Sequence, residues 1–284
     1  MADDSGIRPQ RSLAGKVAIV TGAGAQGEGI GNGRASAILL AEDGCTVICI
    51  DRDGTLAERT TQMIKAEGKG DAIAITCDVT SEEQVKSTVS QVISKYGRID
   101  ILVNIVGIGG ARGTAVETDM AEWAKGMEVN VASMVITAKY CIPEMLKNDP
   151  SRGYRGSIVN MSSVAGLRGG TPHLMYPTSK GAIVNMTRAM ASHHAADGIR
   201  VNCVCPGMVY TPMIYGSGMT SEARESRKNR SLLKTEGYGW DVGAAVRFLA
   251  GEEARWMTGV ALPVDAGATS GVGSELPKTA SINP

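Results

Sequence analysis

Short apolar runs alternate along the chain with longer segments in which apolar residues recur at helical spacing. Seven of the runs are typical of strands buried on both faces, because their apolar residues are continuous and do not alternate with polar ones. The strands are predicted at 17–21, 46–50, 72–77, 101–104, 157–161, 200–204 and 260–264. Helices are predicted from about Ile30 and over Leu56–Glu67, Glu82–Tyr96, Met120–Lys147 and Ser179–Ala196.

This alternation predicts an α/β fold, namely a Rossmann-type doubly wound seven-stranded parallel sheet with helices on both faces. Residues 12–267 are expected to form a single catalytic domain. Residues 1–11 are polar and predict a flexible N-terminus, and the small polar residues 268–284 predict a C-terminal tail. Residues 210–232 are rich in Met, Tyr and Gly, and such a long excursion predicts a loop over the substrate.

The composition is that of an ordinary globular protein. Lys+Arg and Asp+Glu both total 29 of 284 residues, so there is no basic surplus that would indicate nucleic-acid binding. The N-terminus lacks the apolar stretch of a signal peptide, and no run is long enough to cross a bilayer. We therefore expect a cytoplasmic protein with no membrane contact. The six cysteines lie mostly in apolar segments and are expected to be buried free thiols, and no spacing indicates a metal site.

A glycine-rich turn, TGAGAQGEGIGNG at 21–33, connects the first strand to the first helix. Such a turn lets the backbone approach a pyrophosphate, which the N–H groups at the helix N-terminus then bind. Asp51 ends the second strand, where a carboxylate accepts hydrogen bonds from the adenosine ribose and repels a 2′-phosphate. NAD is therefore favoured over NADP, although the neighbouring Arg52 is an argument for NADP. Asp78, which ends the third strand, is placed to bind the adenine amino group. It could instead cap the following helix, although Thr80 or Ser81 suits that role better.

Tyr176 and Lys180 are separated by one helical turn and share a helix face. Transfer of a hydride to a carbonyl carbon requires a proton for the oxygen, and a neighbouring ammonium makes tyrosine a better acid–base group. Ser163 follows the fifth strand, at the sheet edge where ligands bind in such folds, so its hydroxyl is placed to polarise the substrate oxygen.

These motifs occur in the order found in the classical short-chain dehydrogenase/reductase family, which the chain resembles from about residue 12 to 267. The resemblance implies an NAD(P)-dependent enzyme acting on CH–OH and C=O groups. It implies that Tyr176 is the general acid and base, that Lys180 lowers its pKa and binds the nicotinamide ribose, and that Ser163 orients the substrate. Asn130 would hold a water that relays protons from Lys180, and Thr211, with the backbone near Val209, would contact the nicotinamide carboxamide. The full set of cofactor-binding residues that we expect is Gly22, Gly29, Ile30, Gly31, Asp51, Asp78, Val79, Asn104, Tyr176, Lys180, Pro206, Gly207, Val209 and Thr211.

The chain departs from the family pattern in two places. The usual spacing after Gly22 puts a glycine at position 26, which is Gln26 here, so the turn is longer. We place the insertion around Gln26–Glu28 and assign Gly29 and Gly31 as the last two motif glycines. After the fourth strand, the usual Asn-Asn-Ala-Gly is replaced by Asn104-Ile105-Val106-Gly107.

The sequence thus predicts an NAD(H)-dependent oxidoreductase that interconverts a secondary alcohol and a ketone, as a homotetramer or homodimer. Three alternatives stay open. One is an NADPH-dependent ketoreductase of a biosynthetic pathway, another is redox-neutral or multi-step chemistry on a natural product, and the third is a dinucleotide-binding regulator without turnover. The substrate, the reaction direction and the stereochemistry are not encoded in any of these motifs.

Overall fold

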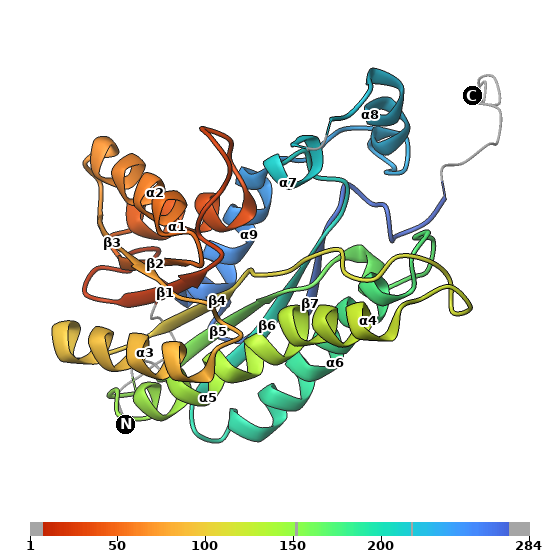
Figure 1. Cartoon of the computed structure of the whole chain (residues 1–284). Coiled ribbons are helices and arrows are strands. Elements are labelled where there is room, and N and C mark those ends of the chain that lie inside the picture. Colours follow the sequence, from red (N-terminus) through yellow and green to blue (C-terminus); the bar gives the residue numbers. More distant parts are fainter. Residues whose placement is uncertain (1–7, 151–152, 217, 273–284) are drawn as a thin grey trace, which may run out of the picture.

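A parallel seven-stranded sheet forms the centre of the computed structural model, which describes residues 8–150, 153–216 and 218–272. The strand order is β3-β2-β1-β4-β5-β6-β7, so the chain reverses direction across the sheet between β1 and β4 (Figure 1). This order confirms the predicted doubly wound fold. The strands are β1 (Val17–Thr21), β2 (Thr46–Asp51), β3 (Asp71–Thr76), β4 (Ile101–Asn104), β5 (Gly156–Met161), β6 (Ile199–Pro206) and β7 (Ala261–Val264).

Helices cover both faces of the sheet (Figure 1). One face packs against α1 (Asn32–Glu42), α2 (Gly54–Glu67) and α9 (Gly239–Ala250), where Ala18 and Val20 of β1 enter the core. The other face packs against α3 (Glu82–Tyr96), α5 (Ser133–Met145) and α6 (Met175–His194), where Val17 and Ile19 enter a second core. Successive β1 residues therefore point to opposite apolar layers, which is why the strand is a continuous apolar run.

The segment predicted as one helix over Met120–Lys147 has three parts. It begins as α4 (Met120–Met127), continues as a π-helical turn over Glu128–Ala132 and ends as α5. A π turn accommodates one residue more than an α turn and is often found at functional sites. Asn130 lies in this turn and is fully buried. The continuous periodicity of the sequence does not reveal this interruption.

Two short helices, α7 (Pro212–Tyr215) and α8 (Ser221–Lys228), form most of the segment predicted as a substrate loop. They lie beyond the carboxyl end of β6, next to the first glycine-rich turn (Figure 1). Of the predicted N-terminal and C-terminal tails, residues 1–7 and 273–284 lie outside the described residues. Within the described tail, Ala268 is buried, so the chain stays packed on the domain just past residue 267.

The six cysteines are free and buried, as the sequence predicts. No helix in the described part of the chain has the length and apolar character needed to cross a membrane. Among the same residues, no group of three or more His, Cys, Asp or Glu side chains is arranged to hold a metal ion.

Candidate active site

The carboxyl ends of β4, β5 and β6 bring the predicted catalytic residues together. Ser163 follows β5 and caps a short 3₁₀ turn, where its hydroxyl accepts a hydrogen bond from the Ala165 N–H at 3.1 Å. Tyr176 and Lys180 both lie on α6, which begins at Met175 and so includes the tyrosine in its first turn. Ser163 lies close enough to Tyr176 to lower the pKa of the phenol, and the Lys180 Nζ lies 5.6 Å from the centre of the Tyr176 ring.

The side chains of this group are largely buried. Burial raises the pKa of Tyr176, and the hydrogen bond to Ser163 offsets part of that effect. Burial also lowers the pKa of Lys180 to about 8, because a nearly enclosed ammonium loses its hydration. Among the causes that shift the pKa of Tyr176 in the protein without cofactor, burial comes first and Lys180 does not appear. The expected lowering of the Tyr176 pKa by Lys180 stays a prediction.

Asn130 connects the π turn to this group. Its amide nitrogen donates to the Ser179 Oγ at 3.0 Å and to the Ile108 carbonyl at 2.9 Å, while its Oδ1 accepts from the Ile108 N–H at 2.7 Å. Lys180 donates to the Met161 carbonyl at 3.0 Å. The asparagine thus fixes the loop after β4 next to the catalytic helix, and its predicted role in holding a relay water stays a prediction.

At the cofactor end, the glycine that packs the helix against the first strand is not the expected one. A methyl group on Gly33 would lie 1.9 Å from the Gly22 carbonyl oxygen, so only glycine fits there. Gly31 is the N-cap of α1. The prediction that Gly29 and Gly31 are the last two motif glycines is therefore wrong: Gly31 and Gly33 hold those positions, and Gly29 belongs to the insertion. The error arose because the chain offers several glycines at the spacing of the motif.

Arg34 holds the inserted turn in place, and sequence reasoning missed it. Its guanidinium is fully buried and donates to the carbonyls of Ala25, Gly27 and Gly29 at 2.8, 2.8 and 2.6 Å. Its Nε donates to Thr60 on α2 at 3.1 Å. A signal was present in the sequence, because a cation in the first turn of a helix opposes the helix dipole and needs another partner.

Asp51 lies at the end of β2, beside the glycine turn. Its Oδ2 accepts from the Gly24 N–H at 3.0 Å and its Oδ1 from the Asp53 N–H at 3.1 Å. Within the described part of the chain it makes no ion pair. Arg52 is exposed, and its charge acts on Asp78, whose pKa is lowered mainly by hydrogen bonds from Thr80.

Some predicted cofactor contacts involve side chains that already have partners. Asp78 accepts from the Thr80 N–H and hydroxyl at 2.9 and 2.7 Å. Asn104 donates to Asn160 at 3.0 Å and accepts from Thr137 at 2.8 Å, and the Val79 side chain packs in the core. A dinucleotide would meet Asn104 and Val79 through their backbone. The N-cap of α3 is Ser81, as the sequence favours over Asp78.

The segment after β6 lies at the same edge of the sheet. Pro206 ends the strand, and a methyl group on Gly207 would lie 2.7 Å from the Asp265 Cβ, so the chain is closely packed there. Val209 pairs with Gly237 in an isolated bridge, and Thr211 is nearly buried at the start of α7. These four residues are thus gathered at one edge of the sheet, as expected.

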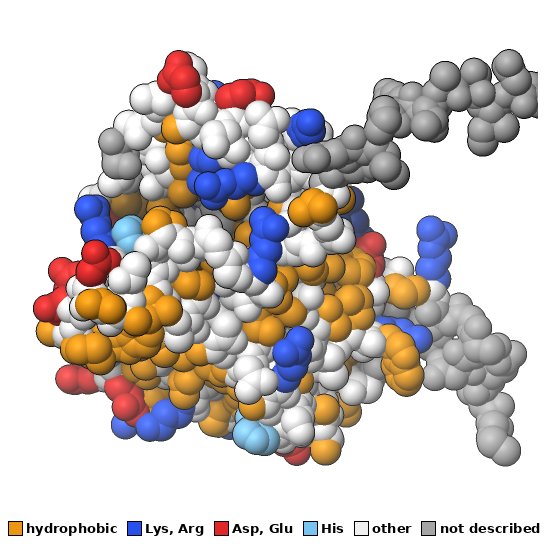
Figure 2. All heavy atoms as spheres, turned by 90° about the vertical axis from the view of Figure 1, so that its right-hand side faces the viewer, with side chains coloured by type: hydrophobic (Ala, Val, Ile, Leu, Met, Phe, Trp, Pro, Cys, Tyr) orange, Lys and Arg blue, Asp and Glu red, His pale blue; other side chains and the backbone are white. Residues whose placement is uncertain are grey.

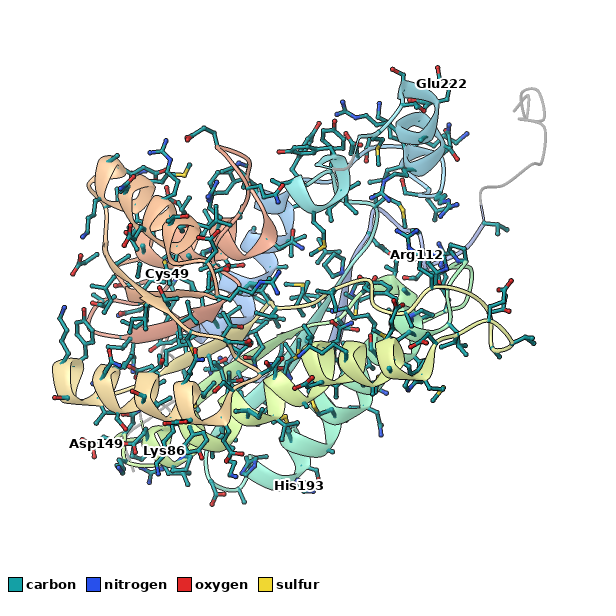
Figure 3. All side chains as sticks on the ribbon, viewed as in Figure 1. Cys49, Lys86, Arg112, Asp149, His193 and Glu222 are labelled. Carbon is teal, nitrogen blue, oxygen red and sulfur yellow. The ribbon has the colours of Figure 1, made fainter. Side chains whose placement is uncertain are left out.

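Side chains at the entrance are a mixture of apolar and basic groups. Figure 2 shows this face, where hydrophobic, Lys and Arg side chains are interspersed while Asp and Glu gather toward its left and upper edges. Met213 is 73% exposed, but Met175 is fully buried against Gly110 and Gly126, so Met175 is a core residue. Arg112 lies on the loop after β4, facing the α8 side (Figure 3), and the neighbouring Gly113 N–H donates to His173 Nδ1 at 3.0 Å. His193 points outward from α6, away from this edge (Figure 3).

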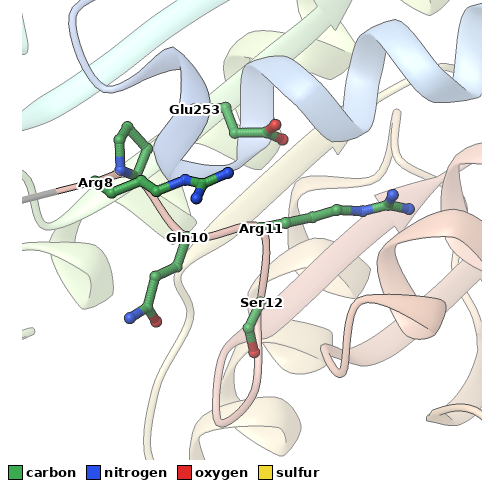
Figure 4. Close-up of a pocket in the computed structure, with 6 residues that line it drawn as sticks. Arg8, Gln10, Arg11, Ser12 and Glu253 are labelled. Atoms are coloured by element: carbon green, nitrogen blue, oxygen red, sulfur yellow. The ribbon is translucent and has the colours of Figure 1, made fainter.

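A separate surface pocket lies near the N-terminal segment (Figure 4). It is lined by Arg8, Pro9, Gln10, Arg11, Ser12 and Glu253. These residues precede β1 or follow α9, so the pocket lies at the opposite end of the strands from Tyr176. Ligands of such sheets bind beyond the carboxyl ends of the strands, which leaves the Tyr176 edge as the candidate active site.

Comparison with known proteins identifies the family. A family model described as "Enoyl-(Acyl carrier protein) reductase" matches residues 24–269. The chain is 35% identical to meso-2,3-butanediol dehydrogenase of Serratia marcescens over 258 residues, which cover 91% of this chain and 96% of that one. The chain belongs to the short-chain dehydrogenase/reductase family. The members of this family are NAD(P)-dependent oxidoreductases of CH–OH and C=O groups, and so is this protein.

Other relatives agree in length and fold. The 3-oxoacyl-(acyl-carrier-protein) reductase FabG of Thermotoga maritima is 35% identical over 257 residues, which cover 90% of this chain and 98% of the relative. Among solved structures, a 7α-hydroxysteroid dehydrogenase complexed with NADH and 7-oxo glycochenodeoxycholic acid superposes with a TM-score of 0.81. It is 33% identical, and the match covers 93% of this chain and 97% of that one.

Proposed function

We propose that this short-chain dehydrogenase/reductase uses NAD(H) to interconvert a secondary alcohol and a ketone, with Tyr176 as general acid and base. The main support for NAD(H) is the position of the Asp51 carboxylate, which two backbone N–H groups hold beside the glycine turn. The exposed Arg52 acts on Asp78, and Arg59 of α2 is paired with Glu28. A 2′-phosphate at this position would therefore face an anion that no ion pair neutralises within the described residues.

The residues at the sheet edge fit a dinucleotide. The close approach of Gly33 to Gly22 packs the start of α1 against the first turn. The N-cap Gly31 makes no side-chain cap hydrogen bond, so the N–H groups of the first helical turn could bind phosphate oxygens. Asp51 would bind the adenosine ribose, Lys180 the nicotinamide ribose, and Thr211 with the backbone of Val209 the carboxamide. When bound, the nicotinamide would exchange a hydride with the reacting carbon.

The chain's own residues would supply the proton and orient the substrate. The Ser163 and Tyr176 hydroxyls lie close enough to interact, so a carbonyl oxygen placed between the two would receive one donor from each. In reduction the phenol gives its proton to the oxygen, and in oxidation the phenolate removes the alcohol proton. The raised pKa of Tyr176 keeps it protonated near neutral pH, which suits the acid role.

Residues 210–232 are the segment that we expect to determine the substrate. Its exposed Met213 and half-exposed Leu232 support a partly apolar substrate of intermediate size.

We further propose that the protein is a homotetramer or homodimer, as the family resemblance implies. Light scattering coupled to size-exclusion chromatography would show this directly, and a clean monomer would contradict it.

The decisive experiment is a titration of the wild-type protein and Asp51→Ala with NADH and NADPH, following energy transfer from the three tryptophans. Hydrogen bonds to a charged group contribute about 1.5–3 kcal/mol, so Asp51→Ala should weaken NADH about tenfold to a hundredfold. NADPH binding should stay constant or improve, because the repulsion is gone. Tighter binding of NADPH by the wild type would overturn the assignment of NAD. Binding of neither cofactor would support a non-catalytic protein.

A further inference from the structure

The inserted part of the glycine turn lies directly against the substrate loop. A methyl group built on Gly29 would lie 2.4 Å from both the Pro212 Cγ and the Tyr215 hydroxyl. A methyl group on Gly216 would lie 3.2 Å from the Gln26 Oε1. The turn that leads to α1 and the start of α7 are therefore in van der Waals contact, although they are almost two hundred residues apart in sequence.

Hydrogen bonds and an ion pair hold the insertion in place on its own side of the contact. The buried Arg34 guanidinium binds three of its carbonyls, those of Ala25, Gly27 and Gly29. Glu28 is paired with Arg59 on α2. Because the carbonyls are held from behind, the Gly29 Cα is presented toward α7 with no side chain between them.

The substrate loop is equally well anchored on the other side. The Tyr215 ring lies 4.8 Å from the Tyr210 ring, and the Arg224 guanidinium of α8 lies 3.9 Å from the centre of the Tyr210 ring. Arg224 also binds the buried carboxylate of Glu236, with an Nε–Oε2 distance of 2.9 Å. A continuous series of contacts therefore runs from Gly29 through two aromatic rings to α8.

These contacts join segments that serve opposite ends of the proposed cofactor. In the proposed function, the glycine turn and the α1 N-terminus would bind the phosphates, whereas Val209 and Thr211, which flank Tyr210, would contact the nicotinamide. We propose that Arg34 and Tyr215 are positioning residues that hold the insertion and α7 together at the cofactor site, so that the cofactor leaves only when this contact separates. The proposal rests on the proposed function, since it concerns release of the same dinucleotide.

Gly29→Ala is the most direct perturbation. The added methyl group would overlap Pro212 and Tyr215, whereas the backbone of Gly29 is in a region that alanine also adopts. Overpacking of this size costs about 1–3 kcal/mol, so dissociation of NADH should be about fivefold to a hundredfold faster. Dissociation is measured by stopped flow as the loss of energy transfer when excess NAD displaces NADH. Gly109→Ala is the matched control, because no atom lies within 4 Å of its added methyl group.

A rescue variant distinguishes disruption of the contact between Gly29 and α7 from a general loss of stability. Tyr215→Phe removes the hydroxyl that the new methyl group meets, so the double variant Gly29→Ala/Tyr215→Phe should recover part of the slow dissociation. Arg34→Lys keeps the charge but cannot reach three carbonyls, so it should also accelerate dissociation. Wild-type dissociation in Gly29→Ala, at an unchanged melting temperature, would overturn the proposal.

Hydrogen exchange without cofactor provides a second readout. In Gly29→Ala, exchange should rise in residues 210–216 as well as in 24–31, while Gly109→Ala stays like the wild type. A rise confined to 24–31 would contradict the contact. If the wild-type protein bound neither NADH nor NADPH, the proposed function would fail, but the exchange comparison would still decide whether the two segments are held together.

Discussion

Lys180 is a buried cation that lowers the free energy of unfolding, and replacing it tests the size of this effect. Its side chain is 3% exposed, and burial lowers its pKa from 10.5 to about 8. The difference between these two pKa values corresponds to about 3 kcal/mol, by which the charged lysine destabilises the folded state near neutral pH. Lys180→Met keeps the length of the side chain and removes the charge.

The sign follows from which state binds more protons. Well below pH 8 the lysine is protonated in both states, and the folded protein carries the full penalty. Between the folded pKa of about 8 and the unfolded value of 10.5, the folded lysine has lost its proton while the unfolded one keeps it, so stability rises with pH. From these two values, the free energy of unfolding gains about 2 kcal/mol between pH 7 and pH 9.5 from this group alone.

The assay is urea unfolding of the wild type and Lys180→Met without cofactor, at pH 7 and 9.5 and one protein concentration. At a single pH two effects of the substitution oppose each other. Removal of the buried charge stabilises the folded state, whereas loss of the hydrogen bond to the Met161 carbonyl destabilises it by about 1–3 kcal/mol. The lost hydrogen bond does not affect the difference in pH dependence between the wild type and Lys180→Met. The other titrating groups are common to both proteins, so that difference reports on Lys180 alone. Identical pH dependence in the two proteins would refute the assignment of a buried, destabilised ammonium.

Two further substitutions test the chemistry and the cofactor turn. Tyr176→Phe should lower kcat by about 10²–10⁴ while NADH affinity stays near that of the wild type, because the hydroxyl serves proton transfer, and a steady-state assay with parallel binding titrations would show this. An equal loss of kcat and of cofactor binding would contradict that role. Gly33→Ala should reduce affinity for both dinucleotides and lower the melting temperature, because its methyl group would lie 1.9 Å from a carbonyl oxygen. Retention of wild-type affinity would show that α1 tolerates displacement.

Much of the fold could be predicted because it depends on local patterns. The strands are continuous apolar runs since each is covered on both faces, and the β–α alternation then leaves few topologies. The residues Ser163, Tyr176 and Lys180 were found because their spacing reflects one strand end and one helical turn. Each of these signals is contained in a few neighbouring positions.

The features that escaped prediction depend on contacts between distant segments. The π turn at Asn130 is determined by how α4 and α5 meet the rest of the fold, and its sequence is compatible with a continuous helix. The choice between Gly29 and Gly33 depends on which one approaches Gly22, which spacing does not specify when glycines recur. Arg34 appeared as an ordinary helical residue because its carbonyl partners belong to a turn of irregular shape.

The π turn also has a consequence for how the sequence can vary. An additional residue per turn shifts the helical phase, so the inward-facing positions of α4 are out of step with those of α5. Substitutions on the outer face of α4 therefore require no compensating substitution at the apolar positions of α5 that pack in the core. Loss of one residue within Glu128–Ala132 would bring the two phases back into step and rotate α4 about its axis. The mutational record of this segment is expected to contain many point changes in α4 and few single-residue deletions in the turn.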